Sequence, residues 1–355
     1  MKNRSNIREE ALKSLYESYG YSQFKMSKFE EYDLYVRNKS FLVSDHIITF
    51  TDTDGKLMAL KPDVTLSIVK NSAESESGIR KVYYNENVYR VPRGALSFKE
   101  IMQAGLECIG DIDGYCVAEV LTLAAKSLAA VSSDYVIDVS HLGIISTLAD
   151  SLSLSADGRK KLLSCIGEKN AHGIDAVCRA EGADENTAEI LKKLMTLKGN
   201  TKEMLDMLKG TACESDANEL ANTVDAVKAM GYKVNVDFSV TDDMKYYSGI
   251  VFKGFVKGIP TSVLSGGRYD NLMKKMGKNS GAIGFAVYLD CFNALDDMSL
   301  EYDADVLVLY GDETDIASLI KKVSEISESG RRVITQKEMP QNMTYREIVD
   351  MRGDK

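Results

Sequence analysis

Two polar positions in residues 60–65 (LKPDVT) have the types and spacing that suit a positively charged ligand. Residues i and i+2 of a strand share one face, so the carboxylate of Asp63 and the hydroxyl of Thr65 could converge on one ammonium group. The same letters also fit a Pro-Asp turn in which Thr65 caps the helix that TLSIVKN begins. The residues alone leave both interpretations open.

A second polar set lies in residues 82–110 and comprises Arg90, Arg93, Gln103 and Glu107. Gln103 and Glu107 lie on one extended run and should share a sheet face with Gly105, where a missing side chain leaves room for a ligand. A carboxylate inside the apolar run AGLECIG needs a cationic partner when it is buried. The alternative is an edge strand on which Glu107 faces solvent.

Residues 243–252 (DMKYYSGIVF) place Tyr246 and Tyr247 next to each other. In a strand the two rings must face opposite sides, so one could line a pocket while the other packs in the core. Taken alone, this pattern is more typical of an aromatic core.

Residues 265–270 (SGGRYD) predict a glycine-pair turn that presents Arg268 and Asp270. Backbone amides in such a turn could bind an anion, but the GxxxxGK[ST] spacing of a P-loop is absent. A purely structural turn explains Arg268 equally well.

The sequence predicts no catalytic residue, metal site or cofactor of its own. It has no GxGxxG or GxSxG motif and no Ser–His or Cys–His arrangement. The six cysteines form no CxxC pair, and the three histidines lack HxxxH spacing. Scattered cysteines in a chain this long indicate reduced thiols and a cytoplasmic location.

Composition indicates a folded chain of 355 residues with 44% apolar and 27% charged residues. A net charge of −9 gives no basic footprint for a nucleic acid, so none is expected as a partner. No apolar run reaches the length of a membrane span, and the N-terminus has no apolar signal core.

The elements that would position these side chains form an α+β pattern. Hairpins without regular βαβ alternation predict an antiparallel sheet flanked by helices. Residues 142–230 lack proline and are broken by glycines, which predicts an insertion of short helices. Residues 301–355 predict a separate βαβ segment after a main domain at 1–300. The expected helices are 7–19 and 113–131, and the expected strands are 47–50, 56–60, 81–90, 101–109, 135–139, 233–240, 249–256 and 284–289.

Taken in order, these motifs resemble the histidyl branch of the class II aminoacyl-tRNA synthetases over residues 5–295. LKPDVT is similar to the LRPEGT histidine motif, and VYRVPRG followed by FKEIMQAGLECIG resembles motif 2 and the histidine-binding strand. KYYSGIVF and SGGRYD resemble the second histidine signature and its continuation, and GAIGFAVYLD resembles motif 3. The resemblance implies a six- or seven-stranded antiparallel sheet and a dimer, with a tail that resembles the start of an anticodon-binding domain.

The resemblance also implies a pocket for L-histidine. Carried over by position, the pocket residues are Asp63, Thr65, Arg90, Gln103, Glu107, Tyr246 and Tyr247. The first two would hold the α-amino group, Arg90 would meet the carboxylate, and the tyrosine pair would line the imidazole side. Gln103 and Glu107 would complete the pocket.

The sequence departs from the synthetase pattern at positions that handle phosphate charge. Asp242 and Cys291 stand where the family has arginines, Pro92 replaces the motif 2 acid, and Ser97 replaces a loop cation. Because fixed cations stabilise the charge of adenylate formation, two lost arginines should remove on the order of 10⁴–10⁶ in rate. Ser27 also replaces the proline of the dimer motif.

A retained amino-acid pocket without activation chemistry resembles the regulatory-subunit branch of this family. That branch implies a short-form ATP phosphoribosyltransferase catalytic subunit as partner. The two proteins would form a hetero-oligomer that acts in histidine biosynthesis. L-histidine would be the feedback effector, binding the inhibited arrangement more tightly. Two alternatives remain: a divergent histidyl-tRNA synthetase, and a stand-alone synthetase-like binding protein.

Overall fold

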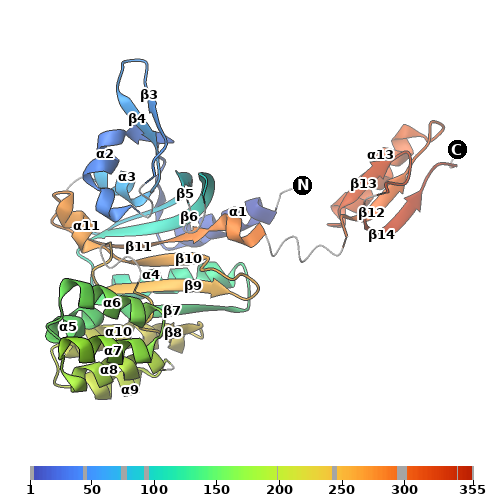
Figure 1. The fold of residues 1–355 in the computed structure, drawn as a ribbon. Helices are drawn as coiled ribbons and strands as arrows, with labels where there is room; N and C mark the ends of the chain where they lie inside the picture. The colour runs from blue at the N-terminus through green and yellow to red at the C-terminus, as the bar shows by residue number, and fades with distance from the viewer. Residues whose placement is uncertain are drawn as a thin grey trace. The chain divides into compact units, whose positions relative to one another are not determined.

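The chain divides into two compact units, Met1–Phe292 and Asn293–Lys355 (Figure 1). The computed structural model describes residues 4–42, 46–72, 78–91, 96–197, 199–241, 246–293, 302–341 and 343–353. The domain boundary expected at residue 300 therefore lies outside the described residues. Within those ranges no helix has the length and apolarity needed to cross a membrane.

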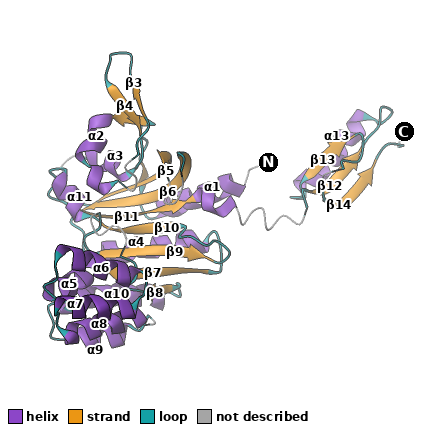
Figure 2. Cartoon of the chain, in the orientation of Figure 1, coloured by secondary structure: helices purple, strands orange, loops and turns teal. Residues whose placement is uncertain are grey.

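The larger unit is built on an eight-stranded sheet (Figure 2). In spatial order its strands are β1 (Ser22–Gln23), β5 (Arg80–Arg90), β6 (Lys99–Gly110), β11 (Gly281–Tyr288), β10 (Leu264–Arg268), β9 (Ile250–Val256), β7 (Tyr135–His141) and β8 (Val234–Val236). All pairs are antiparallel except β1–β5 and β7–β8 at the two edges. The predicted α+β class with an antiparallel-rich sheet is confirmed, although short parallel edge strands raise the strand number to eight.

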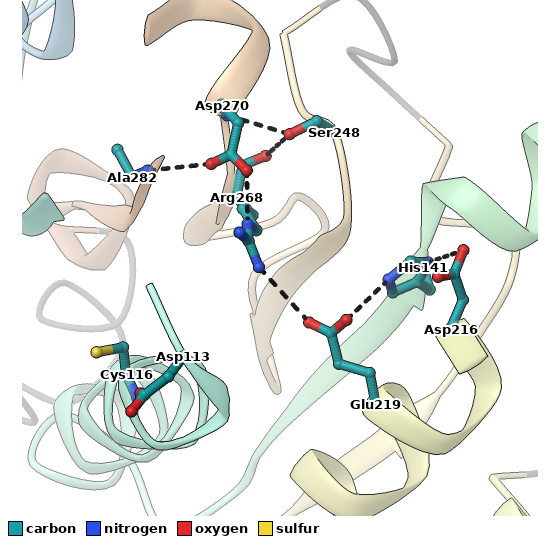
Figure 3. Close-up of polar contacts among 9 residues, drawn as sticks. All are labelled: Asp113, Cys116, His141, Asp216, Glu219, Ser248, Arg268, Asp270 and Ala282. Atoms are coloured by element: carbon teal, nitrogen blue, oxygen red, sulfur yellow. Dashed lines mark hydrogen bonds and ion pairs between the residues drawn. The ribbon is translucent and has the colours of Figure 1, made fainter. Parts of the chain in front are cut away.

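Alternation along β6 gives the sheet two different faces. Leu106 and Cys108 face the helices α1 (Arg4–Ser18) and α4 (Gly114–Ala129), and both side chains are fully buried. Gln103 and Glu107 point to the opposite face, where the cavity lies. Helix α4 starts after Asp113, whose carboxylate accepts a 2.9 Å hydrogen bond from the amide of Cys116 (Figure 3).

A small three-stranded sheet with short helices forms a second layer on the cavity side of the large sheet. Its strand order is β2-β4-β3, and the expected hairpin turns at Gly55, which has a φ of +85°. Apolar residues of this layer share one core with the cavity face of β5, including Ile68 and Tyr84. The elements are β2 (Phe29–Glu31), α2 (Tyr32–Arg37), β3 (Thr49–Thr51), β4 (Leu57–Leu60), α3 (Thr65–Lys70) and α11 (Asp270–Lys275).

Six helices follow β7, where the sequence predicts a helical insertion. They are α5 (Leu142–Ser151), α6 (Ala156–Gly167), α7 (Ala171–Glu181), α8 (Glu185–Thr196), α9 (Thr201–Leu208) and α10 (Glu214–Ala229). Four of them begin at a side chain that accepts a backbone amide, and these caps are Ser155, Asn170, Asp184 and Asn200. The expected strand 233–240 then stops at Val236, because Asp237 accepts the Ser239 amide in a turn.

In its described residues, 302–341 and 343–353, the smaller unit has a three-stranded parallel sheet and one helix. Its order is β13-β12-β14, with β12 (Ala304–Leu309), α13 (Ile316–Glu328), β13 (Val333–Gln336) and β14 (Tyr345–Asp350). Its core is formed by Val306, Val308, Ile326 and Met351. The sequence predicts β12, α13 and β13 but misses β14, an edge strand whose side chains are mostly exposed.

Candidate ligand-binding site

A cavity of about 620 Å³ opens on the face of the large sheet opposite α1 and α4. All seven residues that the sequence assigns to a pocket line it. They come from four separate places, namely the start of α3, the end of β5, the middle of β6 and the segment before β9. The structure thus brings together side chains that lie up to 184 positions apart in the sequence, from Asp63 to Tyr247.

Glu107 lies at the floor of this cavity and is 2% exposed. Its carboxylate accepts a 2.8 Å hydrogen bond from Thr65 Oγ1 and a 2.7 Å hydrogen bond from the Tyr269 hydroxyl. None of the ion pairs among the described residues involves Glu107, so the cationic partner that its burial requires is not one of these side chains. The solvent-facing alternative is wrong, because β6 lies inside the sheet.

Burial raises the pKa of Glu107 from its ordinary 4.5 to about 8. The hydroxyl donors of Tyr269 and Thr65 act in the opposite direction, and the nearby charge of Asp63 raises the pKa further. The cavity floor is therefore a carboxyl group that can hold its proton near neutral pH or ionise beside a ligand cation.

The segment around Asp63 is a turn that leads into α3. The N-cap position of α3 is Val64, and the Asp63 carboxylate before it accepts a 2.9 Å hydrogen bond from the Leu66 amide, so the interpretation of Thr65 as the cap is wrong. Burial raises the pKa of Asp63, partly offset by the Leu66 amide and by the charge of Arg90. Thr65 turns instead towards Glu107, so the strand interpretation of these two residues is wrong while their convergence on one cavity holds.

Tyr246 and Tyr247 both line the cavity, so the prediction that they face opposite sides of a strand is wrong. The pair precedes β9, which begins at Ile250, and strand alternation therefore does not apply to it. The two rings meet edge to face at 4.8 Å between centroids, and Tyr246 also packs on Tyr269 at 5.8 Å. The result is an aromatic wall next to Glu107.

Gly105 does not leave open space for a ligand, in contrast to the sequence-based expectation. A Cβ atom there would lie 2.5 Å from the hydroxyl of Tyr84 and 2.2 Å from the carbonyl oxygen of Phe285. The Tyr84 ring fills this position and itself lines the cavity.

Residues 265–268 form part of strand β10, so the predicted glycine-pair turn is wrong. A Cβ at Gly266 would lie 2.5 Å from the carbonyl oxygen of Gly284, which means that the glycines permit close strand packing. Arg268 does not line the cavity; its Nε donates a 2.8 Å hydrogen bond to Asp270 Oδ2 (Figure 3).

Several cavity residues escape sequence reasoning. Tyr84 and Lys253 lie on strands outside the quoted motifs, whereas Tyr269 and Tyr288 lie inside SGGRYD and GAIGFAVYLD, but the sequence assigns none of the four to the pocket. Their signal is positional, because Lys253 and Ser265 are register partners on β9 and β10 and share the cavity face. Only the sheet register, which the sequence does not give, brings them to the same cavity.

The positions that depart from the synthetase pattern either do not line the cavity or lie outside the residues that the structure describes. Cys291 lies in a short 3₁₀ helix, Leu289–Phe292, and is not among the lining residues. Ser97 is exposed on the way to β6, and Ser27 is exposed before β2. Asp242, Pro92 and Arg93 lie outside the described residues.

An antiparallel sheet with a polar cavity on one face and helices on the other defines a class II synthetase-like protein. A family model described as histidyl-tRNA synthetase matches residues 1–291, and the chain belongs to this family. Family membership confirms the resemblance drawn from the motifs.

Relatives of this chain have two kinds of names. A protein of Caldanaerobacter subterraneus subsp. tengcongensis named ATP phosphoribosyltransferase regulatory subunit is 30% identical over 292 residues, which are 79% of this chain and 76% of that protein. A protein of Methanococcus vannielii named histidine–tRNA ligase is 29% identical over 320 residues, 87% of this chain and 76% of that protein.

A solved structure from Bacillus halodurans has the same fold, with a TM-score of 0.74 at 22% identity. It is described as an ATP phosphoribosyltransferase regulatory subunit/histidyl-tRNA synthetase, and the match covers 99% of this chain and 94% of that one.

Proposed function

We propose that this chain is the non-catalytic regulatory subunit of an ATP phosphoribosyltransferase and binds L-histidine in the cavity described above. Family membership and relatives named as such regulatory subunits, at 28–30% identity, support the role. As the name of the enzyme states, the catalytic partner transfers a phosphoribosyl group to ATP. This chain contributes assembly and control.

The observation on which the proposal rests is the environment of Glu107. A buried carboxyl with hydroxyl donors, and without an ion-pair partner in the described chain, complements a ligand that brings its own positive charge. Tyr246 and Tyr269 lie beside it and suit a flat ring, which supports an imidazole at this end of the cavity. Asp63 then faces the α-amino group and Arg90 the carboxylate, with Gln103 and Tyr247 closing the sides.

The absence of synthetase chemistry is part of the proposal. Cys291 cannot offer a phosphate a positive charge, because a thiol is either neutral or anionic, and burial raises its pKa and so favours the neutral form. Arginines at the positions of Asp242 and Cys291 would supply the fixed cations that adenylate formation requires. We therefore expect no histidine activation by this chain.

A short-form catalytic subunit is the proposed partner, and self-association as a dimer is the proposed arrangement of this chain. The cytoplasm is the proposed location. The described cysteines, among them Cys108 and Cys213, are free thiols, and a reducing compartment suits them.

A second function, a divergent histidyl-tRNA synthetase, is favoured by the relatives named histidine–tRNA ligase at 28–29% identity. Histidine-dependent exchange of pyrophosphate into ATP separates the two functions. Exchange at a rate typical of synthetases would refute the regulatory proposal, and we expect none above background.

Calorimetric titration with histidine tests the site itself. We expect saturable binding by the chain and at least about tenfold weaker binding by Glu107→Ala, since a charged hydrogen-bond partner contributes about 1.5–3 kcal/mol. Unchanged affinity in Glu107→Ala would refute the assignment. The titration is repeated with the catalytic subunit present, and no binding in either state would also refute it.

A further inference from the structure

Charged side chains join helix α10 of the helical insertion to strands β7 and β10 of the large sheet (Figure 3). His141, at the end of β7, lies between two carboxylates of α10. Its Nδ1 is 3.5 Å from Asp216 Oδ2, and its Nε2 is 3.8 Å from Glu219 Oε2. Glu219 also reaches Arg268 of β10, with 4.0 Å between Oε1 and Nη1. One carboxylate therefore faces two basic side chains on two different strands.

The His141 ring occupies a tight position at this junction. It is 4% exposed, and its Nδ1 makes no aligned hydrogen bond within the described chain. A Cβ at Gly143 would lie 2.3 Å from Asp216 Oδ2, so a glycine at the start of α5 lets α10 approach the ring. His141 and Arg268 both lower the pKa of Glu219 against the effect of its burial, which keeps that carboxylate ionised.

Arg268 continues from this junction towards the cavity. Its carbonyl oxygen accepts a 2.8 Å hydrogen bond from the Ser248 amide, and its Nε holds Asp270. The Asp270 amide in turn donates to Ser248 Oγ at 3.1 Å, and its Oδ1 accepts from the Ala282 amide at 3.1 Å. Figure 3 shows Asp270 as the meeting point of these contacts. They fix the backbone immediately after the cavity tyrosines.

The same strand also supports a cavity tyrosine directly. A Cβ at Gly267 would lie 2.8 Å from Cδ1 of the Tyr247 ring, so the ring packs directly on the backbone of β10 at this glycine. The helical insertion reaches the cavity by a second route, because Leu163 of α6 is one of the lining residues. A shift of the insertion would therefore act on the cavity both through Leu163 and through Arg268.

We propose that Glu219 and Arg268 are positioning residues that couple the docking of the helical insertion to the shape of the ligand cavity. Neither side chain lines the cavity, so they act through Ser248 and the Tyr246–Tyr247 segment. Contacts that move α10 would change ligand affinity, and by reciprocity the ligand would change how firmly α10 is held. The coupling adds a regulatory route to the proposed function, and it rests on that function only for the identity of the ligand.

Glu219→Gln tests this coupling, with Asp225→Asn as the matched control. Asp225 lies on the same helix and accepts from Thr201 at 2.9 Å, inside the insertion and away from the junction. Amide hydrogen exchange is measured on the ligand-free chain, and histidine affinity is measured separately by calorimetry. For Glu219→Gln we expect faster exchange over residues 246–250 and about threefold to tenfold weaker histidine binding. Asp225→Asn should change neither.

The outcomes distinguish the coupling from the histidine assignment. Faster exchange only in α10, with residues 246–250 and affinity unchanged, would overturn the coupling. Faster exchange over 246–250 in a chain that never binds histidine would support the coupling and refute histidine as the ligand.

Asp216→Asn removes only the carboxylate facing His141 Nδ1, and it serves as the milder second variant if Glu219→Gln does not fold. That variant should speed exchange at the start of α10 and, to a smaller extent, at 246–250; no change at 246–250 would count against the coupling.

Discussion

Thr65 Oγ1 donates a 2.8 Å hydrogen bond to Glu107 Oε1 and so joins the first residue of α3 to the centre of β6. Both residues are buried, and the carboxylate has a second donor in Tyr269. Two neutral donors at a buried carboxyl leave its charge uncompensated, which is costly in an apolar surrounding. The site is in this sense prepared for a cation that the ligand supplies.

The ligand-free protein should lose stability as the pH rises from about 5 to about 8. The pKa of Glu107 is raised from 4.5 to about 8 by burial, so the folded state keeps a proton that the unfolded chain releases in this window. Its stabilising contribution is complete below about pH 4.5 and is lost as the pH passes through about 8. The expected slope is on the order of 1.4 kcal/mol per pH unit.

Urea unfolding of the wild type and of Glu107→Gln across this range measures that slope. The amide that this substitution introduces stays neutral at every pH, so the free energy of unfolding of the variant relative to the wild type should rise with pH. A difference that does not change with pH would contradict the raised pKa.

Histidine affinity should have a maximum between about pH 6.5 and pH 8. In this interval the free protein has a protonated Glu107 and the free ligand a neutral imidazole, so an imidazolium–carboxylate pair forms without net proton exchange. Binding must take up a proton above the interval and release one below it, and each costs up to about tenfold in affinity per pH unit. Calorimetry at several pH values tests this, and Glu107→Gln should lose the alkaline decline. A histidine affinity that still rises above about pH 8 would contradict pairing with Glu107 and would mean that another group contacts the imidazole.

Tyr269→Phe should lower stability and weaken histidine binding together. The change removes the 2.7 Å donor to Glu107 while keeping the ring that packs on Tyr246. A lost hydrogen bond to a buried carboxyl costs about 1–3 kcal/mol, and the pKa of Glu107 should rise further. Thermal unfolding measures the loss of stability. Tyr115→Phe is the control, because Tyr115 is exposed and its hydroxyl bonds only Glu119 among its described partners. Equal stability of the two variants would mean that the Tyr269 hydroxyl is not a significant donor.

Gly284→Ala should disrupt the cavity floor. A Cβ there would lie 1.7 Å from Glu107 Oε2 and 2.4 Å from the carbonyl oxygen of Leu106, so backbone and carboxylate must both shift. We expect a loss of at least about 2 kcal/mol in stability and no measurable histidine binding. Gly114→Ala is the control, because no atom lies within 4 Å of the added methyl group and the position opens a helix. A tolerated Gly284→Ala would show that the floor is looser than described.

Much of the fold follows from the sequence because most elements have strong local patterns. The run of apolar residues in α4 and the Asp-Gly turn between β3 and β4 are examples. Strand β10 is missed because paired glycines in SGGR usually indicate a turn, and only the crowding around Gly266 shows why a strand needs them. Similarly, the alternation rule fails for Tyr246 and Tyr247 because the strand begins after them.

The cavity could be predicted in part. Asp63, Thr65, Gln103 and Glu107 follow from motif resemblance, and the structure places all of them at one cavity. Tyr269 is not predicted, since its role as a donor to Glu107 depends on a contact between residues 162 positions apart. The junction of His141 with α10 is likewise a product of how the insertion packs on the sheet, which local patterns do not encode.

The phosphoribosyltransferase activity of a short-form catalytic subunit, measured with and without this chain and with increasing histidine, tests the regulatory role and the histidine site together. We expect activity to rise when the two proteins are mixed and histidine then to suppress it, and we expect Glu107→Ala to keep the activation and lose the suppression. Activity that is independent of this chain, or suppression by histidine that persists undiminished in Glu107→Ala, would contradict the proposed function.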